Sequence, residues 1–99
     1  MAKVIQIFDY EINPNSVQKY KKAVEKLKIS MSKVKGLSDF IITNSKSNKN
    51  QFQEIYIFEN EDAYENYEEF LNDDDNDIIS EIQEYIVSNS TKYLTYIEI

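Results

Sequence analysis

The sequence predicts one domain of the α+β class, with strands and helices in the order β-α-β-β-α(α)-β. Four segments show the alternation of side chains that is typical of strands, and the segments between them space their apolar residues as helices do. The chain has 99 residues, the length of one domain, and we expect residues 1–99 to fold as a unit. The hydrophobic share of 41% is ordinary for a globular protein.

The first half of the chain begins with a strand and a long helix. Residues 3–12 place apolar side chains on both faces of a strand, and Asn15 or Ser16 in the turn that follows can cap a helix. Apolar residues then recur at steps of three and four: Val17, Tyr20, Val24, Leu27, Met31 and Val34. Gly36 follows this stripe where a glycine typically ends a helix.

The rest of the chain completes the pattern. Three more segments alternate as strands do: residues 37–45, 51–59 and 91–99. Two segments between the last two strands have helical spacing: residues 63–71 and 78–86. Asn60 is an N-cap candidate for the first of these helices, and the acidic residues 72–77 separate it from the second.

This order is that of ferredoxin-like folds, in which helices cover one face of an antiparallel sheet. A sheet with one exposed face has polar residues on that face, but these strands are apolar on both faces. In the third strand, for example, aromatic residues alternate with Ile55 and Ile57. We therefore expect the second face to be covered by the same face of another copy, in a homodimer.

Charge and composition exclude several classes of function. The net charge of −7 disfavours nucleic acid as a partner, and we interpret the lysine-rich first helix as a solvated face and not as an RNA-binding surface. No run of about 18 apolar residues and no signal peptide is evident, so we expect a cytoplasmic protein without a membrane partner. The chain lacks cysteine and histidine, which excludes thiolate and imidazole catalysis and the usual transition-metal ligands.

Acidic residues between the last two helical segments resemble a calcium-binding loop in their spacing. They would occupy positions 1, 3, 5, 9 and 12 of such a loop: Asp73, Asp75, Asp77, Glu81 and Glu84. The loop needs glycine at its sixth position, where this chain has Ile78. We interpret these residues as an acidic helix cap and expect no bound metal.

Three stretches have the residues and spacing of a known family: FDYEINPNS at 8–16, VKGL at 34–37 and IYIFENEDAY at 55–64. With them, the whole chain resembles the antibiotic biosynthesis monooxygenase family of dimeric α/β barrels. The resemblance implies that two sheets close face to face into a barrel. It also implies a pocket in each subunit between sheet and helices. Many members oxidise phenolic or quinol substrates with molecular oxygen and without metal or flavin.

The resemblance suggests two catalytic candidates. Tyr64 matches a pocket tyrosine in the helix after the third strand, and we expect its hydroxyl to orient a substrate hydroxyl. Glu54 stands where some members have a pocket asparagine; it is the candidate base, although a solvent-facing or barrel-edge position is the stronger expectation for it. Phe58 stands where the family typically has tryptophan, and a pocket arginine of some members has no counterpart.

The eight tyrosines and five phenylalanines supply the remaining candidates. Cofactor-free oxygenation requires an apolar pocket, a group that helps to deprotonate the substrate, and hydrogen bonds that orient the resulting anion. We expect five aromatic side chains to bind the substrate: Phe8, Tyr10, Tyr56, Phe58 and Tyr67. The alternative is that these side chains only pack the core and keep their hydroxyl groups at its rim.

Two functions remain open. The first is a cofactor-independent monooxygenase that acts on a small phenolic, quinol-like or polyketide-like aromatic substrate. The second is a catalytically silent module that binds a small ligand or a partner on the same homodimeric fold. A haem-degrading branch of the family relies on an asparagine, a tryptophan and a haem-ligating histidine, where this chain has Phe8, Tyr67 and Asp77. Since the chain has no histidine, we expect neither haem degradation nor any other bound cofactor.

Overall fold

The computed structural model describes residues 2–73 and 77–99, with side chains described at 2–67 and 78–99. Four strands form one antiparallel sheet in the order β2-β3-β1-β4. The strands are β1 (Val4–Glu11), β2 (Leu37–Asn44), β3 (Gln51–Phe58) and β4 (Lys92–Ile97). The helices are α1 (Val17–Met31), α2 (Glu61–Asp73) and α3 (Asp77–Tyr85).

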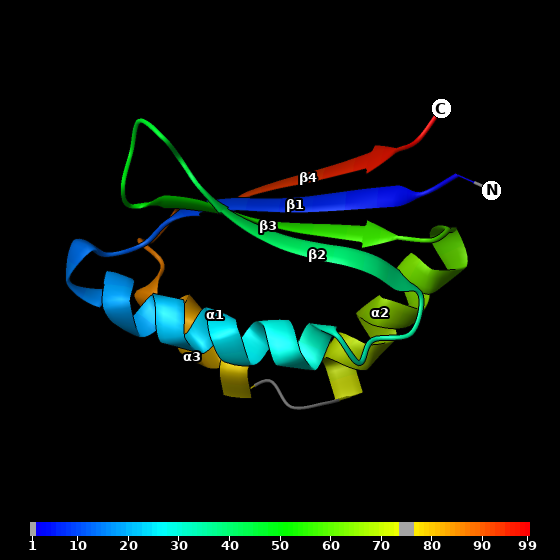
Figure 1. Ribbon diagram of the computed structural model, residues 1–99, viewed down its shortest axis with the longest axis horizontal. Coiled ribbons are helices and arrows are strands. Elements are labelled where there is room, and N and C mark those ends of the chain that lie inside the picture. The colour runs from blue at the N-terminus through cyan, green and yellow to red at the C-terminus, as the bar shows by residue number, and fades with distance from the viewer. Residues whose placement is uncertain (1, 74–76) are drawn as a thin grey trace.

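The helices all lie on one face of the sheet, and the opposite face is open (Figure 1). This arrangement confirms the predicted α+β class and the order β-α-β-β-α(α)-β. The inner strands β3 and β1 carry the centre of the core, and α1 packs beside α3 below them. Within the described residues, every helix is too short or too polar to cross a lipid bilayer.

The entry into α1 differs from the prediction. Pro14–Ser16 forms a short 3₁₀ turn, and the Asn13 side chain caps it by accepting a hydrogen bond from the Asn15 backbone nitrogen at 3.1 Å. Ser16 precedes α1, but its side chain makes no capping hydrogen bond. The side-chain cap expected from Asn15 or Ser16 is therefore wrong, because the cap lies at the start of the turn that leads into the helix.

Gly36 lies in a turn beyond α1, which ends at Met31, and not directly after the helix as predicted. Its φ of 87° is in the left-handed region, which glycine adopts without strain. A Cβ atom at this position would lie 2.6 Å from the Cβ of Ala63. Gly36 thus lets the turn before β2 pack on the first turn of α2, where Asn60 accepts a hydrogen bond from the Ala63 nitrogen at 2.9 Å, as its predicted cap role requires.

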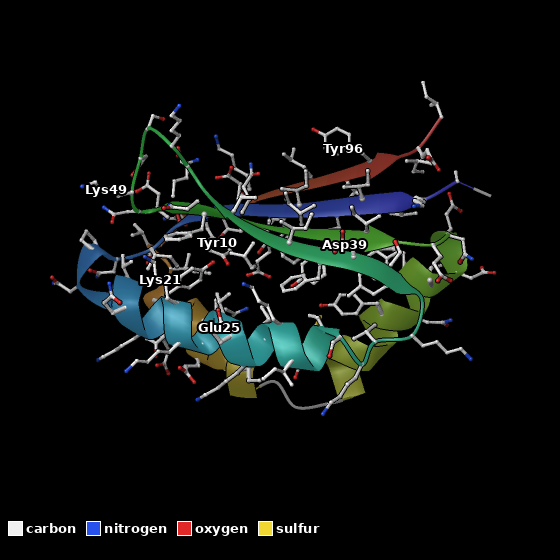
Figure 2. The ribbon with its side chains drawn as sticks, viewed as in Figure 1. Tyr10, Lys21, Glu25, Asp39, Lys49 and Tyr96 are labelled. Atoms are coloured by element: carbon white, nitrogen blue, oxygen red, sulfur yellow. The ribbon has the colours of Figure 1, made fainter. Side chains whose placement is uncertain are left out.

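The two faces of the sheet carry different side chains, because successive residues of a strand point to opposite sides. Large side chains are almost completely buried on the helix-covered face: Val4, Tyr10, Phe52, Tyr56 and Phe58. The open face is mostly aliphatic and partly exposed: Ile5, Ile7, Ile41, Ile55, Ile57, Leu94 and Tyr96. Figure 2 shows Tyr10 between sheet and helices and Tyr96 on the other side of the sheet.

Candidate functional site

Glu54 lies on the helix-covered face of β3, where only 7% of it is exposed. The expectation of a solvent-facing or barrel-edge position is wrong for two reasons. β3 is an inner strand with β2 on one side and β1 on the other, and its alternation turns Glu54 inward together with Phe52 and Tyr56. A carboxyl group in such a place requires hydrogen-bond partners, because an unpaired buried charge is strongly unfavourable.

Tyrosine hydroxyl groups supply these partners. Tyr10 of β1 donates to Glu54 Oε2 at 2.5 Å, and Tyr56 of β3 donates to Glu54 Oε1 at 2.5 Å. The hydroxyl of Tyr20 on α1 lies 2.8 Å from that of Tyr10. Since a hydroxyl has one hydrogen and that of Tyr10 points to Glu54, Tyr20 must donate to Tyr10. The result is a buried chain of donors that ends on one carboxyl group.

The protonation of this cluster depends on burial. Burial raises the pKa of Glu54 above its ordinary value of about 4.5, while the hydrogen bonds from Tyr10 and Tyr56 act in the opposite direction. Burial, together with the charge on Glu54, raises the pKa of both Tyr10 and Tyr56. Burial also raises the pKa of Tyr67 to about 12, although a hydrogen bond with Tyr56 lowers it. The tyrosines therefore stay protonated, and Glu54 is the group in the cluster that can take up a proton.

A cavity of about 520 Å³ lies against this cluster, within the range of roughly 300–1,000 Å³ that is typical of small-molecule sites. Its aromatic walls are Phe8, Tyr10, Tyr56, Tyr67 and Tyr93. Its aliphatic walls are Leu27, Ile79, Ile82, Ile86 and Val87. Its polar groups are Glu54, Gln83, Ser88, Asn89 and Thr91. The cavity thus combines an apolar interior with a few polar groups.

The end of α3 and the segment that follows it form the outer wall of the cavity. Two backbone hydrogen bonds hold this wall to the end of β1: Asn13 N donates to Tyr85 O, and Val87 N donates to Glu11 O, both at 2.8 Å. Asn89 turns the chain toward β4 with a positive φ of 63°. Residues 87–89 and Tyr93 of the edge strand β4 line the cavity and are also exposed, so the cavity reaches the surface on this side.

Phe8 connects the Glu54 cluster to the edge of the sheet. Its ring meets that of Tyr56 edge-on at a centroid distance of 5.5 Å, and that of Tyr93 on β4 at 5.3 Å. Tyr93 is 72% exposed, whereas Tyr56 is fully buried. The three rings form a continuous aromatic wall from the protein surface to the carboxyl group.

Most of the predicted site residues come together in this cavity: Phe8, Tyr10, Glu54, Tyr56 and Tyr67. Phe58 and Tyr64 are not among its lining residues. Phe58 is completely buried, and its ring meets that of Tyr64 edge-on at 5.5 Å. The Tyr64 hydroxyl accepts a hydrogen bond from Gln6 Nε2 at 3.3 Å. These two residues lie toward the end of the sheet where α2 begins.

The sequence reading did not include Tyr20 or the residues of 83–91 in the site. Tyr20 carried one usable signal, because its hydroxyl is the only polar group in the apolar stripe of α1 and must find a partner when buried. The segment 87–91 carried none, since its polar sequence does not indicate over which end of the sheet it folds.

Metal ligation has no candidate among the described residues, which contain no group of three or more acidic side chains placed to hold an ion. The acidic segment compared with a calcium loop lies largely outside the described part of the chain. Asp75 is not described, nor are the side chains of Asp73 and Asp77. The predicted absence of a metal there stays a prediction.

Neither a protein-family model nor a curated protein matches the sequence. Solved structures do match. A conserved protein from Methanosarcina mazei has a TM-score of 0.83 at 15% identity, over 97% of this chain and 92% of that one. A candidate antibiotic biosynthesis monooxygenase from Caulobacter crescentus has a TM-score of 0.83 at 10% identity, over 99% and 91%. SnoaB, a cofactor-independent oxygenase from Streptomyces nogalater, was solved as the mutant N63A and has a TM-score of 0.74 at 8% identity, over 95% and 90%. This chain has the fold of the antibiotic biosynthesis monooxygenases.

Proposed function

We propose that the chain is a cofactor-independent monooxygenase that oxidises a small phenolic or quinol-like aromatic substrate in the cavity beside Glu54. The observation that carries this proposal is a buried carboxyl group of raised pKa on the wall of an aromatic cavity, oriented by two tyrosine hydroxyls. The shared fold supports it, since SnoaB is a cofactor-independent oxygenase.

Glu54 is the base in this proposal. Its raised pKa brings the carboxyl group closer to the pKa of a phenol, which is about 10, and so makes proton transfer from the substrate less unfavourable. Once Glu54 has taken the proton, Tyr10 and Tyr56 remain hydrogen-bond donors at the cavity wall, where they can stabilise the substrate anion. The apolar side chains of the wall reduce the contact of this anion with water.

The oxidation balances without an added reductant, as anthrone illustrates. Its reacting CH₂ group loses a proton to Glu54, and the resulting carbanion forms a C–O bond with O₂ to give a peroxide. Loss of the second C–H proton breaks the O–O bond and leaves a C=O group. Both hydrogens end in one molecule of water, and the substrate supplies all the electrons. The sum is anthrone plus O₂ to anthraquinone plus water.

The test is oxygen consumption with anthrone at neutral pH, compared with heat-denatured protein because anthrone also oxidises spontaneously. Glu54→Gln keeps the shape of the side chain and removes the base, and we expect a rate about a hundredfold lower. Glu81→Gln is the matched control. Glu81 also accepts a tyrosine hydroxyl, from Tyr85 at 3.0 Å, but it is not a lining residue of the cavity. We expect it to retain the native rate.

Two results would contradict the proposal. If the native protein consumes no oxygen above background with anthrones or hydroquinones, the oxygenase proposal is refuted. The alternative function, a catalytically silent binding module, would then be favoured. One feature favours that alternative, because each carboxylate oxygen of Glu54 already accepts a tyrosine hydroxyl. If Tyr64→Phe slows the reaction as much as Glu54→Gln, the Tyr64 hydroxyl contributes to the reaction as expected from the sequence, and the assignment of the site to the Glu54 cluster alone is wrong.

We further propose that the functional unit is a homodimer in which two open sheet faces meet. The open face carries Ile55 at its centre, with Ile7 of β1 and Ile41 of β2 as its cross-strand neighbours. Ile41 is 40% exposed, and the edge strand β4 adds Leu94 and Tyr96 to the same surface. Contiguous apolar surface of this kind is typical of protein interfaces, and an identical face is complementary to it under a twofold axis.

A further inference from the structure

We infer that the cavity selects uncharged phenolic aromatic compounds and rejects analogues that carry an additional acidic group. The inference rests on the proposed function, because it takes Glu54 as the base, and it adds the charge of the substrate to that proposal.

The first observation is the placement of positive charge in the molecule. The chain has no arginine and no histidine, so lysine is its only basic residue type. All eleven lysines are exposed, and none lines the cavity. Figure 2 shows one of them, Lys49, in the hairpin that projects from the sheet. Residues 68–77, whose side chains the structure does not describe, contain no lysine, so they cannot add a basic side chain to the cavity.

The second observation is that the cavity holds an acidic group but no counter-ion for it among the described lining residues. Glu54 is the carboxyl group on the described wall, and its surroundings are aromatic rings and aliphatic side chains. Burial already makes its ionised form less favourable, so a second buried anion nearby would add repulsion without a counter-ion. The overall charge of −7 acts in the same direction on an anion that approaches from solution.

The charge of the site during the reaction leads to the same conclusion. Glu54 acts as a base only in its ionised form, and in that form the complex with a neutral phenol carries one negative charge, first on Glu54 and then, after proton transfer, on the substrate. A carboxylate on the substrate would raise this to two negative charges in both states. The polar side chains near the opening are neutral: Gln83, Ser88, Asn89 and Thr91. They suit hydroxyl and carbonyl groups, which they can bind by hydrogen bonds, better than an anion.

The test compares two ligands of the same ring system by isothermal titration calorimetry at about pH 8: 2-naphthol, and 6-hydroxy-2-naphthoic acid, which adds one carboxylate. We expect the acid to bind about tenfold more weakly or worse. In Glu54→Gln, which removes the charge and keeps the volume, we expect this ratio to fall by about threefold or more. Glu81→Gln should keep the native ratio, because Glu81 lies outside the cavity lining.

Equal or tighter binding of the acid to the native protein would overturn the inference, as would binding of neither ligand or a ratio that Glu54→Gln leaves unchanged. Binding is measured here without turnover. A protein that discriminates between the ligands but does not oxidise anthrone would therefore refute the proposed oxygenase and leave the selectivity in place. A protein that oxidises anthrone but binds both ligands equally well would refute the selectivity and leave the proposed oxygenase in place.

Discussion

The two faces of the sheet are built from the same four strands but differ in chemistry. The helix-covered face has aromatic side chains with hydroxyl groups, and one buried carboxyl group that two of these hydroxyls bind. The open face has isoleucines in its centre and polar residues toward its ends. Gln51 and Gln53 each donate to Asp9 at 2.8 Å at one end, and Asp39 lies beside Ile57 toward the other. Successive residues of β3 therefore belong alternately to the helix-covered face and to the open face.

This difference shows how one strand can serve two purposes. Hydroxyl-bearing rings leave polar groups inside the fold, which must pair with one another and can then bind a polar substrate. Isoleucine offers only apolar contact and no such chemistry, which suits a surface that pairs with its own copy. We expect changes on the open face to alter assembly, and changes on the covered face to alter binding, reaction and pH dependence.

The largest effect is expected on the open face. Ile55→Lys places a charge at the centre of this face, and in a twofold dimer it would bring two such charges into one apolar interface. We expect the native protein to sediment at twice the monomer mass of 11.7 kDa, and the variant to sediment as a monomer or to unfold.

The matched control for that experiment is Ile29→Lys. Ile29 is 62% exposed and belongs to α1, a helix that lies on the covered side of the sheet and not on its open face (Figure 1). The same substitution there should leave the dimer intact. A native protein that sediments as a monomer at micromolar concentration would contradict the pairing of open faces.

The fold could be predicted from the sequence because local patterns decide it. Side-chain alternation predicts the four strands, and the helical spacing of apolar residues predicts the helices between them. The position of the cavity along the sheet could not be predicted, since it depends on which part of the covered face the helices fill. The start of α2 covers the end of this face near Phe58 and Tyr64, whereas the cavity lies at the part of the face that carries Tyr10.

Glu54 illustrates a different limit. The same alternation that buried Phe52 and Tyr56 also required Glu54 to point inward, so its direction was readable from the sequence. What the sequence did not reveal was the set of hydroxyl groups that make this burial possible. They come from three separate elements, with Tyr20 on α1, Tyr10 on β1 and Tyr56 on β3.

A smaller effect is expected in the pH dependence of stability, from the covered face. Between the ordinary pKa of about 4.5 and the raised pKa of Glu54, the folded state holds a proton that the unfolded state has lost. The free energy of unfolding should therefore fall as the pH rises through this window, by about 1.4 kcal/mol for each unit by which the pKa is raised. The neighbouring Tyr10, Tyr20, Tyr56 and Tyr67 do not titrate in this range, because burial raises their pKa values.

Urea denaturation of the native protein and of Glu54→Gln, at intervals from about pH 4 to pH 8, isolates this contribution. Glutamine mimics the protonated carboxyl group, so the native protein should lose stability relative to the variant as the pH increases. A difference between the two proteins that stays constant over the range would show that Glu54 has the same pKa in the folded and unfolded states.

The most direct test of the division between the two faces uses isoleucine, which occurs on both sides of the sheet. Isoleucine δ1-methyl NMR spectra recorded during a titration with 2-naphthol report on each side separately. We predict shifts that saturate at the cavity residues Ile79, Ile82 and Ile86, with no change at Ile5, Ile7, Ile55 and Ile57. Saturating shifts confined to the open-face residues would place the ligand site on the open face. That result would contradict a binding site on the helix-covered face.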